Sequence, residues 1–176
     1  MPDHFVETNI IIGYTVDWDR QTPIVRPYLD SLSGINLHTS RRVLEEAEDV
    51  INDRQRLAKQ AARRIYQDFD AGRRRPSIQQ IVDFVWGELS HCRESVVDHV
   101  IQHIRDNEHY YIGLTQANNR RGLEATTDDI DDDFNSAIDI ITDIRNYNCD
   151  GFDCSIFVDI KQDYSDYSVF STIEPV

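Results

Sequence analysis

The amino-acid sequence predicts an α/β fold in which long helices surround a short parallel sheet. Helical patterns dominate the 176 residues, and only three short stretches have the composition of strands. The first of these stretches is an apolar run typical of a buried central strand. A chain of this length can bury a substantial core, so we expect a single domain over residues 1–176.

The apolar run near the N-terminus contains the first candidate site. Residues 3–14 read DHFVETNIIIGY, and we interpret them as the central strand, ended by Gly13. Glu7, Thr8 and Asn9 interrupt the run with polar side chains. A buried carboxylate is costly unless it is compensated, and a cation beyond the end of the strand is a common form of compensation. The triplet therefore indicates a functional site.

The next segments predict a helix, a second strand and a much longer helix. Thr22-Pro23 has the pattern of an N-cap followed by proline at the first helical position, and it opens a helix through Leu32. Residues 35–38 read as a strand, and Thr39-Ser40 leads from it into a helix that extends to about Asp70. Ligands of open α/β sheets bind at the carboxyl ends of the strands, so this junction is a candidate site.

A helical wheel distinguishes two glutamates in the first turns of that long helix. Glu46 flanks the apolar cluster that begins at Val43, whereas Glu45 points nearly opposite to it. Glu46 is therefore the carboxylate that we expect to face inward. The alternative is that both acids are present because they interact favourably with the helix dipole.

Two further helices follow, and one of them carries a histidine pair. Ser77 has the position of an N-cap for a helix over residues 78–89, and a second apolar stripe predicts a helix over residues 97–104. His99 and His103 lie four residues apart, a spacing that can bind a transition metal. Both fall opposite the apolar stripe on the wheel, so an exposed pair is the better interpretation.

The C-terminal third predicts one more long helix, a short helix and a final strand. Thr126 to Asp129 matches a capping box, and the crowded aspartates of the first turns suit the helix dipole and a solvated face. Asp153 precedes apolar residues at helical spacing, and residues 169–174 read as a strand that ends in Thr-x-Glu.

Taken in order, these segments resemble PIN-domain nucleases. The matching motifs are Glu-Thr-Asn inside the first apolar run, Val-Leu-x-Glu in the long helix, the Asp before the short helix, and the terminal Thr-x-Glu. The first and fourth acids are Glu where PIN domains usually have Asp. The resemblance implies four catalytic, metal-binding acids, which are Glu7, Glu46, Asp153 and Glu174. Asp150 is the alternative to Asp153.

The resemblance also implies a fold and an activity. The fold would be three-layer α/β/α with a short central parallel sheet and long helices. The activity would be that of an endoribonuclease that needs Mg²⁺ or Mn²⁺, with Thr8, Asn9 and Thr172 orienting ligands or water. Many PIN proteins are VapC-like toxins, so an antitoxin partner and a homodimer are implied as well. The alternatives are a catalytically inactive PIN-fold binding or scaffold protein and a purely structural acidic helical domain.

The composition resembles that of proteins from extreme halophiles, as in haloarchaea. The chain holds 32 acidic and 18 basic residues, a net charge of −14, and Lys59 and Lys161 are its only lysines. Three cysteines without zinc-ligand spacing predict free thiols in a reducing compartment. No apolar run has membrane-spanning length, so we expect a cytoplasmic protein. No Gly-rich phosphate loop or nucleophile elbow favours another class of enzyme.

The charge imbalance predicts that salt stabilises the fold. Because 32 carboxylates face only 18 basic groups, screening of their repulsion should raise the free energy of unfolding as KCl rises toward molar concentrations. Circular dichroism during a KCl titration measures this effect. A protein that is fully folded and equally stable in dilute buffer would contradict the halophilic interpretation.

Overall fold

The computed structural model describes residues 3–31, 36–69, 76–116, 120–148 and 153–154. Helices make up most of this part of the chain. The elements are, in order, β1 (Asp3–Phe5), α1 (Thr8–Thr15), α2 (Thr22–Ser31), β2 (Asn36–Ser40), α3 (Arg41–Asp68), α4 (Ile78–Glu88), α5 (Glu94–Asp106), α6 (Glu108–Gln116), α7 (Arg120–Asn148) and β3 (Asp153–Cys154).

The predicted three-layer α/β/α fold of the PIN type is wrong, because the described residues are mostly helical. The strands β1, β2 and β3 contain only three, five and two residues. β1 pairs with the first residues of β2 in parallel, and β3 pairs with the last two in antiparallel orientation. Strands this short connect helices and cannot form a layer that helices cover on both faces. The strand predicted over residues 169–174 lies outside the described residues.

The central strand predicted over residues 3–14 is mostly helix α1. The carbonyl oxygen of Glu7 accepts hydrogen bonds from the backbone N–H groups of Ile10 and Ile11, at 2.9 and 3.1 Å, and these bonds start the helix. Ile11 and Ile12 are buried there as helical residues. A short run of apolar residues is compatible with a buried strand and with a buried helix, so periodicity alone does not separate the two.

Close packing of α1 against α2 explains why glycine occupies position 13. A Cβ atom added to Gly13 would lie 2.9 Å from Val25 Cγ2 and 3.1 Å from Gln21 Cβ. Helix α2 buries Val25 and Leu29 and leaves Ile24 exposed. Thr22 donates a hydrogen bond from its hydroxyl to the carbonyl oxygen of Val16, and this bond fixes the loop between the two helices.

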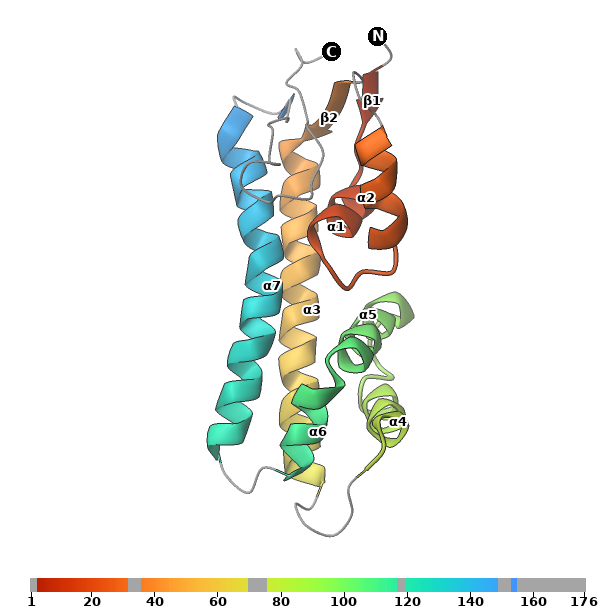
Figure 1. The fold of residues 1–176 in the computed structure, drawn as a ribbon, viewed down its shortest axis with the longest axis vertical. Coiled ribbons are helices and arrows are strands. Elements are labelled where there is room, and N and C mark those ends of the chain that lie inside the picture. The colour runs from red at the N-terminus through yellow and green to blue at the C-terminus, as the bar shows by residue number, and fades with distance from the viewer. Residues whose placement is uncertain (1–2, 32–35, 70–75, 117–119, 149–152, 155–176) are drawn as a thin grey trace. The chain divides into compact units, whose positions relative to one another are not determined.

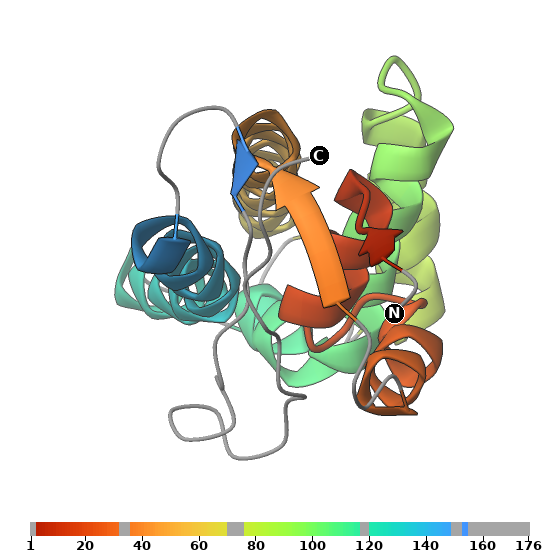
Figure 2. The ribbon, with the colours of Figure 1, turned by 90° about the horizontal axis from the view of Figure 1, so that it is seen from above.

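The chain divides into two compact units. The first contains residues 1–51 and 135–176, and the second contains residues 52–134. Helices α3 and α7 each contribute to both units, and within each unit they run side by side in opposite directions (Figure 1 and Figure 2). That residues 1–176 behave as a single domain stays a prediction.

The contact between α3 and α7 follows from a repeat of buried positions. Buried residues recur at alternating spacings of three and four along both helices, which is the pattern of helices that pack together along their length. Alanines take several of the buried positions of α3, and the partly apolar stem of Arg54 takes another. The repeats are Leu44, Ala47, Ile51, Arg54, Ala58, Ala61 and Ile65 on α3, and Ile130, Phe134, Ala137, Ile141 and Ile144 on α7.

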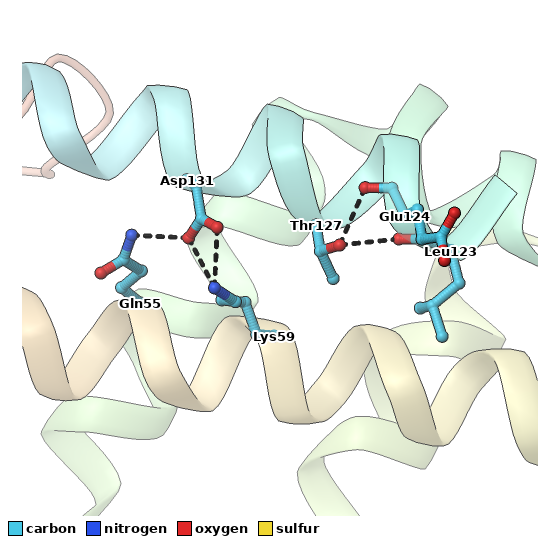
Figure 3. Close-up of polar contacts among 6 residues, drawn as sticks. All are labelled: Gln55, Lys59, Leu123, Glu124, Thr127 and Asp131. Carbon is cyan, nitrogen blue, oxygen red and sulfur yellow. Dashed lines mark hydrogen bonds and ion pairs between the residues drawn. The ribbon is translucent and has the colours of Figure 1, made fainter. Parts of the chain in front are cut away.

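An ion pair supports this contact in each unit. In the second unit, Lys59 Nζ donates to both carboxylate oxygens of Asp131, at 2.8 and 2.7 Å, and Gln55 Nε2 donates to the same carboxylate at 2.7 Å (Figure 3). In the first unit, Arg145 pairs with Glu48. The lysine and Asp131 side chains are each about 30% exposed, so solvent screens this pair less than a fully exposed one.

Helix α7 begins earlier than the capping-box pattern predicts. It starts at Arg120, and Thr126 and Thr127 lie inside it. The Thr126 hydroxyl donates to the carbonyl oxygen of Gly122, and the Thr127 hydroxyl donates to that of Leu123, both at 3.0 Å (Figure 3 shows the second bond). A threonine hydroxyl that bonds to its own helix in this way is compatible with a helix interior, so the pattern gave the wrong start.

The helix over residues 78–89 is confirmed as α4, and Ser77 is its N-cap. The Ser77 side chain accepts a hydrogen bond from the backbone of Gln80, whose own side chain accepts one from the Ser77 backbone. Ile81 and Val85 are fully buried, whereas Trp86 is 41% exposed. Among the described residues, no helix combines the length and apolarity needed to cross a membrane.

A substitution at Gly13 tests the packing of α1 on α2. Gly13→Ala should lower the free energy of unfolding by about 1–3 kcal/mol, because the new methyl group would overlap Val25. Gly87→Ala in α4 is the control, since no atom lies within 4 Å of the added Cβ, and it should stabilise the helix by roughly 0.5–1 kcal/mol. Urea unfolding at fixed KCl measures both variants. Equal effects of the two substitutions would contradict this packing.

Candidate functional site

The candidate site lies where β1 and β2 end and α1 and α3 begin. The Thr39 hydroxyl at the end of β2 donates a buried hydrogen bond of 2.8 Å to the carbonyl oxygen of Val6, just beyond β1. Ser40 Oγ then accepts a hydrogen bond of 3.3 Å from the backbone N–H of Val43, in the manner of an N-cap for α3. These two contacts hold residues 6–8 beside the first turns of α3.

The predicted acid Glu46 is bonded to Thr8, the second residue of the polar triplet. Thr8 Oγ1 donates a hydrogen bond of 2.8 Å to Glu46 Oε2, although the two residues are 38 positions apart in sequence. Glu45 points elsewhere and accepts a hydrogen bond of 3.1 Å from Arg41 Nε. Both glutamates are exposed, so the prediction that Glu46 faces inward is wrong. The structure therefore brings Glu46, and not Glu45, to the start of α1.

Glu7 directly precedes this contact. It is the N-cap residue of α1, but its side chain does not bond to the helix. Within the described residues the exposed Glu7 carboxylate makes no hydrogen bond or ion pair, and it belongs to the same junction as Glu46 because Thr8 links the two segments. Asn9 follows, exposed in the first turn of α1.

The backbone of Asp153, the third predicted acid, lies at the same junction. Asp153 in β3 pairs with Ser40, the residue that immediately precedes α3. The prediction that a short helix begins at Asp153 is wrong at this residue, because Asp153 lies in a two-residue strand. The remaining predicted site residues lie outside the described residues: Asp150, Thr172 and Glu174.

The chemistry of this junction fits a hard cation only in part. Glu7 and Glu46 supply carboxylate oxygens, the ligand type that Mg²⁺ and Mn²⁺ prefer. Among the described residues, however, no group of three or more His, Cys, Asp or Glu side chains is arranged to hold a metal ion. A complete site would therefore need at least one further oxygen ligand, and Asp153 is a candidate from the predicted set because its backbone pairs with Ser40.

The histidine pair of α5 is divided between two environments, and the prediction that both are exposed is wrong. His99 is partly exposed, and its Nδ1 bonds to the carbonyl oxygen of Ser95. His103 is fully buried. Its Nδ1 shares a hydrogen bond of 2.8 Å with the hydroxyl of Tyr111, and its Nε2 donates one of 3.0 Å to Asp133 Oδ2. His103 is thus part of the core and not a metal ligand.

The same network perturbs two tyrosines of α6. Burial, and then the neighbouring Asp133 carboxylate, raise the pKa of Tyr111 far above its usual value of 10.0. Burial also raises the pKa of Tyr110, with further contributions from Asp133, Asp129 and Asp132. A buried phenolate next to these carboxylates would be strongly disfavoured, so Tyr111 stays protonated in the folded protein. Its hydroxyl therefore acts as a structural hydrogen-bonding group.

The raised pKa of Tyr111 predicts a loss of stability in alkali. Below pH 10 the tyrosine is protonated in both the folded and the unfolded chain. Above its unfolded pKa of 10.0 only the unfolded chain releases the proton, so the free energy of unfolding should fall by up to ~1.4 kcal/mol per pH unit. Urea unfolding between pH 9 and 11 should show a shallower decline in Tyr111→Phe than in the wild type.

The matched control for this prediction is Tyr28→Phe, which removes the hydroxyl of an exposed side chain of α2. It should keep the alkaline decline of the wild type. At neutral pH, Tyr111→Phe should also cost about 1–3 kcal/mol, because it removes the hydrogen-bonding partner of a buried imidazole nitrogen. An alkaline decline that is as steep in Tyr111→Phe as in the wild type would exclude Tyr111 as its source.

Comparison of the chain with protein-family models, with curated proteins and with solved structures finds no match. The PIN-domain resemblance therefore stays a prediction from short motifs. The junction at the start of α3, which joins Glu7, Thr8, Glu46 and the backbone of Asp153, is the feature on which a function can rest.

Proposed function

We propose that the protein is a divalent-metal-dependent hydrolase that cuts phosphodiester bonds in RNA at the junction of β2 and α3. Glu7, Glu46 and Asp153 would hold Mg²⁺ or Mn²⁺, with Glu174 as the fourth acid of the predicted set. The supporting observation is the hydrogen bond between Thr8 and Glu46, which joins two predicted acidic motifs that are far apart in sequence. The antitoxin partner and the homodimer stay predictions that follow from the resemblance alone.

The carboxylates have defined tasks in this proposal. A water oxygen attacks phosphorus, a new P–O bond forms, and the bond to the leaving ribose oxygen breaks. One carboxylate of the group accepts a proton from the attacking water, and solvent protonates the leaving oxygen. Thr8 keeps Glu46 in place through its hydroxyl. The metal, when bound, would stabilise the charge on the phosphate oxygens and lower the pKa of water.

The electrostatics of the chain favour a cation at this junction. The net charge of −14 raises the local concentration of cations around the whole surface. Adjacent carboxylates repel one another, and a divalent cation relieves that repulsion. The exposure of Glu7 and Glu46 leaves both carboxylates accessible to solvent ions and to substrate.

Substitution of the two glutamates tests this proposal. Glu46→Gln should keep the Thr8 hydrogen bond, since the amide oxygen can still accept it, but should lose the negative charge. Cleavage of a single-stranded RNA in Mn²⁺ or Mg²⁺ should fall about 100-fold or more in Glu46→Gln and in Glu7→Gln. EDTA should stop the wild-type reaction. The assay needs a series of KCl concentrations, because salt weakens phosphate contacts.

Glu45→Gln is the matched control, since Glu45 is the neighbouring exposed glutamate and pairs with Arg41. It should keep nearly full activity and Mn²⁺ affinity. Calorimetric binding of Mn²⁺ that depends on Glu46, without cleavage of RNA, would support the alternative of an inactive binding protein. Equal losses in Glu45→Gln and Glu46→Gln would contradict the assignment of the site.

A further inference from the structure

Two consecutive arginines open α3, and each has a glutamate four residues later. Arg41 Nε donates a hydrogen bond of 3.1 Å to Glu45 Oε1, which is the usual ion pair for this spacing. Arg42 and Glu46 have the same spacing, but they form no ion pair within the structure. Glu46 instead accepts its hydrogen bond from Thr8. The carboxylate of Glu46 is thus bonded to α1 and not to the arginine one turn before it.

Arg42 is a cation without a partner among the residues that the structure describes, in a protein of net charge −14. Its side chain is exposed, and among the described residues it has no hydrogen bond and no ion pair. The chain has 32 acidic residues for 18 basic ones, so a basic residue has an excess of possible partners. A positive charge in the first turn of a helix also interacts unfavourably with the helix dipole. Neither local pairing nor helix stability explains an arginine at this position.

We propose that Arg42 binds a phosphate of the RNA strand next to the hydrolytic site. This inference rests on the proposed function, because the strand is the substrate of that site. Arg42 lies one helical turn before Glu46 on the same face of α3, so its side chain is long enough to bring the guanidinium to the surface around the Thr8–Glu46 contact. The planar guanidinium can donate two parallel hydrogen bonds to one phosphate, a geometry that lysine lacks.

The acidity of the protein makes such a contact necessary. A surface with net charge −14 repels a polyanion, and high salt weakens but does not reverse this repulsion. A strand can approach the carboxylates only if a local positive charge offsets them. Arg41 cannot serve equally well, because Glu45 already neutralises it. Arg42 thus determines which phosphate of the strand lies beside Glu46.

The test compares Arg42→Gln with Arg41→Gln in the full chain. Binding of a fluorescently labelled single-stranded RNA is measured over a series of KCl concentrations. Arg42→Gln should weaken binding about tenfold, as expected for loss of a charged hydrogen bond. The slope of log affinity against log salt should become shallower by about 0.7, the value for one phosphate contact in a single strand. Arg41→Gln should change neither quantity.

Two further measurements separate substrate binding from a structural role. Arg42→Lys should restore the salt slope, because it keeps the charge, but only part of the affinity, because it lacks the planar guanidinium. The thermal midpoint of Arg42→Gln should equal or exceed that of the wild type, since an unfavourable charge leaves the first turn of the helix. A clear fall in the midpoint together with the loss of RNA binding would assign Arg42 a structural role and overturn the inference.

The outcomes distinguish this inference from the hydrolase proposal. Wild-type RNA affinity and salt slope in Arg42→Gln, combined with loss of cleavage in Glu46→Gln, would overturn the role of Arg42 and leave the hydrolase proposal standing. RNA binding that depends on Arg42 without cleavage in any metal would support the role of Arg42 and defeat the hydrolase proposal. Binding of inorganic phosphate at Arg42 without binding of RNA would overturn the assignment to an RNA strand.

Discussion

The apolar contact between α3 and α7 is the constraint on which the rest of each unit depends. Both helices repeat buried positions at spacings of three and four residues, so each has one face that must be covered along its whole length. Lys59 with Asp131 in one unit, and Arg145 with Glu48 in the other, fix which residues meet across the contact. The shorter helices can only pack on what this pair leaves uncovered.

The position of the candidate site follows from how the chain enters α3. A helix that long needs a defined start, and Thr39 and Ser40 provide it by bonding to the end of β1 and to the first turn of α3. The same bonds bring residues 6–8 to the beginning of the helix. Both Thr8 and Arg42 lie where they could donate a hydrogen bond to the Glu46 carboxylate, and the Thr8 hydroxyl is the donor that the structure has. This hydroxyl contact links the carboxylate of Glu46 to α1, and among the described residues Arg42 has no partner.

Long periodic segments could be predicted from the sequence, whereas features that depend on distant contacts could not. The apolar period of α3 and α4 predicted their extent within a few residues, but Glu46, which the wheel placed inward, is as exposed as Glu45. The isoleucine run of α1 was misread as strand because a short apolar run has no decisive period. His103 falls opposite its apolar stripe on the wheel, and contacts from two other helices, among them those with Tyr111 and Asp133, make it a core residue.

The scarcity of lysine gives the pairing of α3 with α7 a chemical reporter. Lys59 is one of two lysines in the chain, and its ammonium group donates to both oxygens of Asp131. An acylating reagent reacts only with a neutral, accessible amine, so Lys59 must first leave this carboxylate. Its acylation rate therefore measures how often the ion pair between α3 and α7 opens in the second unit.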